Sequence, residues 1–171
     1  MPRMEFAAPV RVRSDTICGA KSFLRGARIM SVKDMEKLDD VGMKAWDDHD
    51  LEAWAAIFAD KFEWRDDTQP DPLRTKDEAK KYMQAWMTAF PDMRVKTVNR
   101  VVTDDAVGAE IEFSGTNSGP MDMGGQRIPP TNKKVKAHAT YFTKAKDGKI
   151  VEFHSHPNIA ELMGQLGISG S

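Results

Sequence analysis

The sequence contains a single cysteine, Cys18, among 171 residues. A lone cysteine excludes an internal disulfide and a cysteine-rich zinc site, and it is typical of a protein kept in a reducing compartment. Long apolar runs are also missing, because none approaches the roughly 20 residues that a membrane-spanning helix needs. We therefore expect a cytoplasmic protein without a membrane partner.

Neither sign of charge dominates, since 25 lysine and arginine residues face 26 aspartate and glutamate residues. This balance argues against a nucleic-acid partner, which would require a basic surface. Residues 1–28, however, hold six basic and only two acidic side chains. We interpret residues 1–29 as a basic, disordered extension or as the product of an upstream translation start, with a targeting or nucleic-acid arm as the alternative. Residues 30–171 are long enough for one domain.

Four segments carry apolar residues at helical spacing. Ser31 with Asp34, and Thr75 with Glu78, resemble the capping boxes that begin a helix. Pro91 ends the third helix, because the residue before a proline avoids the helical conformation. The sequence therefore predicts helices over about 31–48, 50–58, 75–90 and 159–166.

Other segments alternate between apolar and polar residues, which predicts β-strands. Asp147 and Gly148 are typical of a tight hairpin turn between the last two strands. The helices are segregated from a largely antiparallel set of strands, so the expected fold class is α+β. The predicted strands cover about 62–66, 93–101, 107–113, 135–141 and 149–156.

Strand parity indicates which side chains face the interior. Ala137 and Ala139 are small and leave space beside Tyr141 on the same face. Asn117 continues the inward series of its own strand, and Asp66 continues that of Phe62 and Trp64. Apolar walls with a few polar groups are typical of a small-molecule pocket. The side chains that we expect to contact a ligand are Trp64, Trp86, Phe90, Asn99, Phe113, Met121, Met123 and His154.

Five segments, taken in order, resemble one family: WDDHDLEAWAAIFADKFEW, YMQAWMTAFPDMR, GTNSGPMDMGGQRIPPTNKKV, DGKIVEF and AELMGQLG. They are similar to the SnoaL-like polyketide cyclases (ester cyclases) of the NTF2-like superfamily, over about residues 31–168. The resemblance implies a cone in which a curved sheet wraps around helices. It also implies an interior pocket, a homodimer, and cofactor-free acid/base chemistry on a hydrophobic polyketide- or steroid-like carbonyl compound.

The family's acid/base aspartate and its assisting histidine correspond to Tyr141 and Asn117 in this chain. A tyrosine, with an ordinary pKa of about 10, is better suited to donate a hydrogen bond to a carbonyl or enolate than to remove a proton. We expect Tyr141 and Asn117 to act together. Asp66 is either the missing general base or a carboxylate that caps the following turn. A dehydratase, an isomerase and a non-catalytic binding or dimerisation module remain alternatives.

Two further features allow more than one interpretation. The segment from Gly115 to Thr131 is too long for a simple hairpin turn. Its Met121 and Met123 either cover the pocket mouth and touch a ligand or seal a core or dimer contact. His154 and His156 are two residues apart, which suits a metal or an acid/base pair, but no third ligand lies nearby. We expect structural roles for them and no metal.

Overall fold

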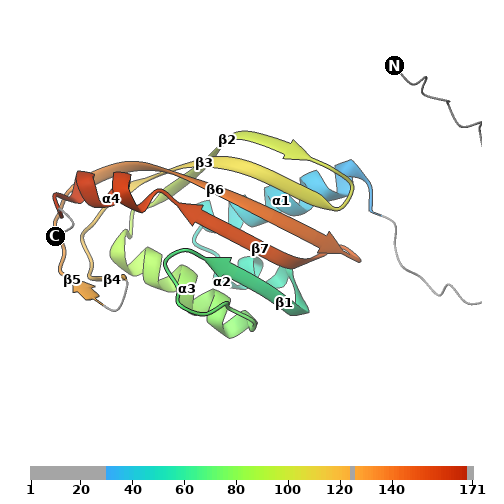
Figure 1. Cartoon of the computed structure of the whole chain (residues 1–171), viewed down its shortest axis with the longest axis horizontal. Coiled ribbons are helices and arrows are strands. Elements are labelled where there is room, and N and C mark those ends of the chain that lie inside the picture. Colours follow the sequence, from blue (N-terminus) through green and yellow to red (C-terminus); the bar gives the residue numbers. More distant parts are fainter. Residues whose placement is uncertain (1–29, 124–125, 169–171) are drawn as a thin grey trace, which may run out of the picture.

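The computed structural model describes residues 30–123 and 126–168, and the predicted 1–29 extension lies outside them. Its fold is α+β, as the sequence predicts (Figure 1). None of the helices in these ranges has both the length and the apolar character to cross a membrane. In chain order the elements are α1 (Val32–Asp47), α2 (Leu51–Ala56), β1 (Phe58–Asp66), α3 (Lys76–Ala89), β2 (Arg94–Val102), β3 (Ala106–Thr116), β4 (Met121–Met123), β5 (Gln126–Ile128), β6 (Lys134–Lys146), β7 (Lys149–Pro157) and α4 (Ile159–Leu166).

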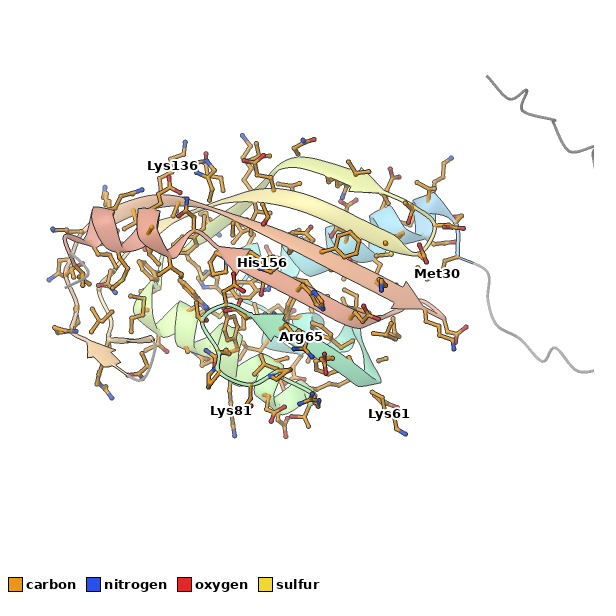
Figure 2. All side chains as sticks on the ribbon, in the orientation of Figure 1. Met30, Lys61, Arg65, Lys81, Lys136 and His156 are labelled. Carbon is orange, nitrogen blue, oxygen red and sulfur yellow. The ribbon has the colours of Figure 1, made fainter. Side chains whose placement is uncertain are left out.

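The strands β1, β7, β6, β3 and β2 form one sheet in that order. All neighbours are antiparallel except β1 and β7, which run parallel. The helix α1 packs against β2 and β3, and α2 packs against α1 and α3. Figure 2 shows the lysines Lys61, Lys81 and Lys136 pointing away from the molecule. The hydrophobic core contains side chains from both the sheet and the helices, among them Trp54 of α2 and Phe153 of β7.

The helix ends form as the sequence predicts. Ser31 and Asp34 make a complete capping box at α1, and Thr75 and Glu78 make another at α3. Each box satisfies backbone N–H groups that the first turn of a helix leaves without partners. Gly167 ends α4 with a φ of 70°, a left-handed conformation that glycine adopts without steric cost.

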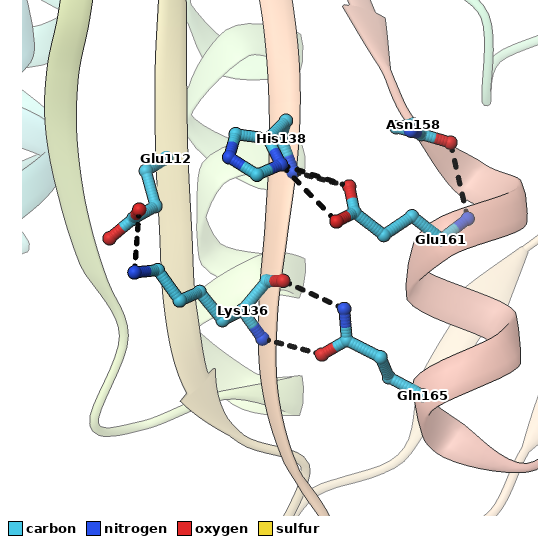
Figure 3. Close-up of polar contacts among 6 residues, drawn as sticks. All are labelled: Glu112, Lys136, His138, Asn158, Glu161 and Gln165. Atoms are coloured by element: carbon cyan, nitrogen blue, oxygen red, sulfur yellow. Dashed lines mark hydrogen bonds and ion pairs between the residues drawn. The ribbon is translucent and has the colours of Figure 1, made fainter.

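The strand β6 extends past the end of β7, and α4 satisfies its free edge (Figure 3). The Gln165 amide accepts a hydrogen bond from the Lys136 N–H and donates one to the Lys136 carbonyl, both at 2.7 Å. The Glu161 carboxylate accepts the His138 N–H at 2.9 Å. These side chains replace a missing strand, so this edge of β6 is not open to pairing with another chain.

A β-bulge changes the expected parity of β2. The register shifts between Thr97 and Asn99, after which Asn99 lies opposite Glu110 and Arg100 lies opposite Ala109. The extra residue turns Asn99 to the exposed outer face and brings Arg100 to the inner face. The prediction that Asn99 faces the pocket is therefore wrong, because strict alternation fails at a bulge.

The glycine-rich segment forms a small hairpin of β4 and β5 that packs against α3. Met121 is buried in the hydrophobic core, and the side chain of Met123 lies outside the part of the chain that the structure describes. Gly119 donates its N–H to the Ala89 carbonyl at 3.2 Å. The position of Met121 fits the alternative in which this segment seals a core.

Gly119 should be intolerant of a side chain, because a Cβ there would lie 1.8 Å from the Thr88 carbonyl oxygen. We expect Gly119→Ala to lower the free energy of unfolding by about 1–3 kcal/mol in urea denaturation. Gly164 in α4 is the control, since a Cβ there meets nothing within 4 Å. Gly164→Ala should stabilise the protein by about 0.5–1 kcal/mol through helix propensity. Equal effects of the two changes would contradict the close contact.

Candidate functional site

A cavity of about 90 Å³ lies between the inner face of the sheet and helices α1 and α3. Five of the side chains predicted to face a pocket line it: Trp64, Asp66, Trp86, Phe113 and Tyr141. Most of the wall is apolar, as expected for a small-molecule site. The remaining lining residues are Met43, Trp46, Tyr82, Met93, Val95, Ile111, Ala139, Thr140, Phe153, Ser155 and Pro157.

Asp66 forms the first polar corner of the cavity. It lies at the end of β1, directly opposite Ser155 of β7, and is only 7% exposed. Its carboxylate accepts hydrogen bonds from the Thr68 N–H at 2.9 Å and from the hydroxyl groups of Thr68 and Ser155. Trp64 donates its indole N–H to the Ser155 oxygen at 2.7 Å. A carboxylate has about four acceptor sites, so Asp66 can accept one more hydrogen bond.

Tyr82 of α3 lies beside this corner. Burial raises the pKa of its hydroxyl well above the usual value, and the negative charge of Asp66 raises it further. Tyr82 therefore stays protonated at any physiological pH. Its oxygen is 3.5 Å from the Thr68 hydroxyl, which is longer than a good O–H···O hydrogen bond. Helical spacing puts Tyr82 on the buried face of α3, and that apolar pattern gives no sign of a role for its hydroxyl.

Tyr141 forms the second polar corner. Its hydroxyl donates to the Asp39 carboxylate of α1 at 2.6 Å. Arg100, brought inward by the bulge in β2, donates to the other Asp39 oxygen at 2.9 Å and also to Asp40 at 2.6 Å. A buried carboxylate is costly unless it is paired in this way.

Burial is the main cause of the pKa shifts at this corner. It raises the pKa of the Asp39 carboxyl, and the hydrogen bonds from Tyr141 and Arg100 oppose that rise. Burial also raises the pKa of the Tyr141 hydroxyl, and the nearby charge of Asp39 adds to the effect. Sequence reasoning missed Asp39, although it falls at helical spacing between Met35 and Gly42 on the buried face of α1. An acidic residue in an apolar stripe was the available signal.

Asn117 does not line the cavity and lies apart from the Tyr141 corner. It is 0% exposed, and its amide donates to the carbonyls of Ala89 and Gly119 at 3.2 and 2.9 Å. Its side-chain oxygen accepts the N–H and hydroxyl of Thr131 at 2.9 and 3.0 Å. All of its hydrogen-bonding capacity holds the glycine-rich segment in place. The structure therefore does not bring Asn117 and Tyr141 together.

Three other predicted contact residues also lie away from the cavity. Phe90 is fully buried and packs against Trp86 and Phe113, with ring centroids 6.0 and 5.0 Å apart. His154 lies opposite the exposed Phe142, on the outer face of the sheet. Met121 belongs to the small hairpin described above.

His156, labelled in Figure 2, is also outward and contacts Asp67 at 2.9 Å. His154 and His156 therefore share a face, but it is not the face of the cavity. Within residues 30–123 and 126–168, no group of three histidine, cysteine or acidic side chains is placed to hold a metal ion.

A curved, mostly antiparallel sheet that encloses an apolar cavity with helices is the arrangement of the NTF2-like fold. A family model described as SnoaL-like polyketide cyclase matches residues 37–166, and the chain belongs to that family. A comparison with curated proteins gives no match.

Solved structures show the same fold. AclR from Streptomyces galilaeus is 23% identical with a TM-score of 0.70, over 82% of this chain and 85% of its own. TsrD from Streptomyces laurentii is 19% identical with a TM-score of 0.69, over 80% and 97%. A protein with a ketosteroid isomerase-like fold from Catenulispora acidiphila is 11% identical with a TM-score of 0.63, over 78% and 94%.

Arg100→Met tests how much the ion pair between Arg100 and the buried Asp39 stabilises the folded protein. The change keeps the aliphatic stem but leaves the carboxylate with Tyr141 alone. We expect a loss of about 1–3 kcal/mol in the free energy of unfolding, less than for a fully buried pair because Arg100 is partly exposed. Adding Asp39→Asn should recover part of the loss, because it removes the unpaired charge.

Arg94 of the same strand provides the control for this experiment. Its side chain is 68% exposed and makes a surface contact with Asp47. Arg94→Met should change the free energy of unfolding by no more than about 0.5 kcal/mol in urea denaturation. If both substitutions lowered the free energy of unfolding by a similar amount, the ion pair with Asp39 would contribute no more to stability than an exposed ion pair.

Proposed function

We propose that this protein binds a hydrophobic cyclic compound that carries a carbonyl group, polyketide- or steroid-like in character, and acts on it by acid/base chemistry without a cofactor. The observation that carries the proposal is the Asp66 corner: a buried carboxylate in the wall of an apolar cavity, with the Tyr82 hydroxyl beside it. Family membership supports the ligand class.

Asp66 and Tyr82 have complementary roles in this chemistry. The Asp66 carboxylate takes a proton from a carbon next to the ligand carbonyl, and the electron pair of that C–H bond moves toward the carbonyl oxygen. The oxygen gains negative charge, which a hydrogen-bond donor stabilises. The Tyr82 hydroxyl supplies that donor by turning from the Asp66 carboxylate to the ligand oxygen, since its contact with Thr68 is long and its raised pKa keeps the proton in place. Return of the proton to another carbon completes an isomerisation. Attack of the carbanion on a second carbonyl gives an alkoxide, and return of the proton from Asp66 to that alkoxide completes a cyclisation.

The size of the cavity limits the ligand. Its volume of about 90 Å³ is below the roughly 150 Å³ of a protein cavity that holds benzene. A compound of more than one ring therefore enters only if side chains move. Met43 and Trp86, which line the cavity and are only partly buried, are the side chains best placed to do so.

A non-catalytic binding module is the second candidate function. It is favoured by one observation: the two family acid/base positions, Tyr141 and Asn117, are occupied by side chains that hydrogen-bond within the protein. In that case Asp66 would orient a ligand without exchanging a proton. The two candidates differ in whether a bound ketone exchanges hydrogen with solvent.

The outer face of the sheet supports assembly into a homodimer. Phe142 of β6 and Val101 of β2 are 47% and 71% exposed there, and both lie opposite Gly108 of the intervening strand β3. Large apolar side chains grouped on a sheet face are typical of a surface that is covered by a partner. We place this dimer in the cytoplasm, since a chain with one cysteine suits a reducing compartment.

Asp66→Asn should abolish proton exchange while preserving the shape of the corner. We would incubate 2-tetralone in D₂O and follow loss of the protons next to its carbonyl by NMR. The wild-type protein should exceed the buffer rate, and Asp66→Asn should reduce the excess by about 100-fold or more. Asp67→Asn is the control, since Asp67 is exposed and pairs with His156. If calorimetry detects binding but exchange stays at the buffer rate, the binding module is the correct function.

Phe142→Glu should dissociate the proposed homodimer, because it places a charge in the apolar contact. Sedimentation velocity should show a dimer for the wild-type protein and a monomer for this variant. Val41→Glu is the control, because Val41 is 51% exposed on α1 rather than on the outer sheet face. A wild-type monomer at micromolar concentration would refute the proposed assembly.

A further inference from the structure

At the Tyr141 corner, the only hydroxyl proton is already donated within the protein. The Tyr141 hydroxyl has one proton, and that proton is donated to Asp39 across 2.6 Å. A hydroxyl bonded to a carboxylate at this distance makes a charge-assisted hydrogen bond, which is about twice as strong as a neutral one. A ligand carbonyl at Tyr141 would have to break this bond in order to accept the proton.

Asp39 cannot supply a proton in place of the tyrosine. One of its oxygens accepts from Tyr141 and the other from Arg100 at 2.9 Å. Both donors bond to the carboxylate form, and a proton on either oxygen would face a donor instead of an acceptor. The ion pair with Arg100 thus holds Asp39 as the acceptor of the Tyr141 proton.

The other hydroxyl groups of the neighbouring wall are not directed at a ligand, because Ser155, opposite Tyr141, already donates to Asp66, and Thr140 lies opposite the outward-facing His156. Ala139, Ile111 and Phe153 line the cavity near Tyr141, and none has a polar side-chain atom. The ring of Phe153 stacks on that of Tyr141, with centroids 5.4 Å apart. Trp46, whose indole N–H has no hydrogen bond within the described ranges, lies on the Tyr82 side. The free lone pair of the Tyr141 oxygen is therefore the polar feature of this wall.

We infer that Tyr141 recognises a hydroxyl group of the ligand and accepts its hydrogen bond, rather than donating to a carbonyl. The ligand class becomes narrower: a cyclic compound with a phenolic, enolic or alcoholic hydroxyl at one end and the reacting carbonyl at the Asp66 end. This inference rests on the proposed function, because both corners must belong to one ligand site. It also reverses the role expected for Tyr141 from the sequence.

Calorimetric titrations with matched probes test the inference. We would use 2-naphthol, which donates a hydrogen bond, its methyl ether 2-methoxynaphthalene, which only accepts, and the ketone 2-tetralone. Wild-type protein should bind 2-naphthol about three- to tenfold more tightly than the ether, the range expected for one net hydrogen bond. Tyr141→Phe should remove this preference. Thr143→Val, which removes a buried hydroxyl of the same strand that does not line the cavity, should retain it.

The outcomes separate the inference from the proposed function. If none of the three probes binds to the wild-type protein, the ligand site itself is wrong. If the probes bind but the ether matches 2-naphthol, only the role of Tyr141 is wrong. A purely structural Tyr141 would lower the melting temperature on substitution without changing the ratio of the two affinities. The variant Asp66→Asn separates the two acceptors of the cavity, because a preference that disappears there and persists in Tyr141→Phe belongs to Asp66 and overturns the inference.

Discussion

The burial of one carboxylate, Asp39, determines how the helices and the sheet meet. Asp39 and its two partners join three elements, since Asp39 lies in α1, Arg100 in β2 and Tyr141 in β6. Without these partners the buried charge would cost several kcal/mol, so α1 must lie where both donors reach it. The same geometry fixes the Tyr141 hydroxyl at the cavity wall. The hydrogen bonds that hold Asp39 and position α1 thus also determine whether Tyr141 can donate or accept a hydrogen bond at one end of the site.

The fold was largely predictable because its signals are local. Capping boxes at Ser31 and Thr75, the Asp147–Gly148 turn and the periodicity of the strands each act within a few residues. The β-bulge in β2 was not predictable, since it depends on pairing with β3 and on the stabilisation gained when Arg100 turns inward and pairs with Asp39. The parallel pairing of β1 with β7 joins residues about 90 positions apart in the chain, and no local pattern encodes it.

The candidate site was predictable only in part, for a related reason. Strand and helix periodicity placed Trp64, Asp66, Trp86, Phe113 and Tyr141 correctly, because burial follows local parity. Hydrogen-bond partners do not follow parity. Tyr141 and Asp39 are 102 residues apart, and Asp66 depends on Ser155, 89 residues away. A pattern can show that a polar side chain faces inward, but not whether its protons are already used by the protein.

The hydrogen bonds already made within the protein determine which side chains can take part in acid/base chemistry of the kind found in the family. At the two family acid/base positions, the Tyr141 proton is bound to Asp39 and the Asn117 amide is bound to backbone groups. Neither side chain can remove a proton from a ligand. The carboxylate that lines the cavity is Asp66, at the end of β1. If the protein is an enzyme, the fold and cavity are those of the family, whereas the base has moved to another strand and the former acid/base position recognises the ligand.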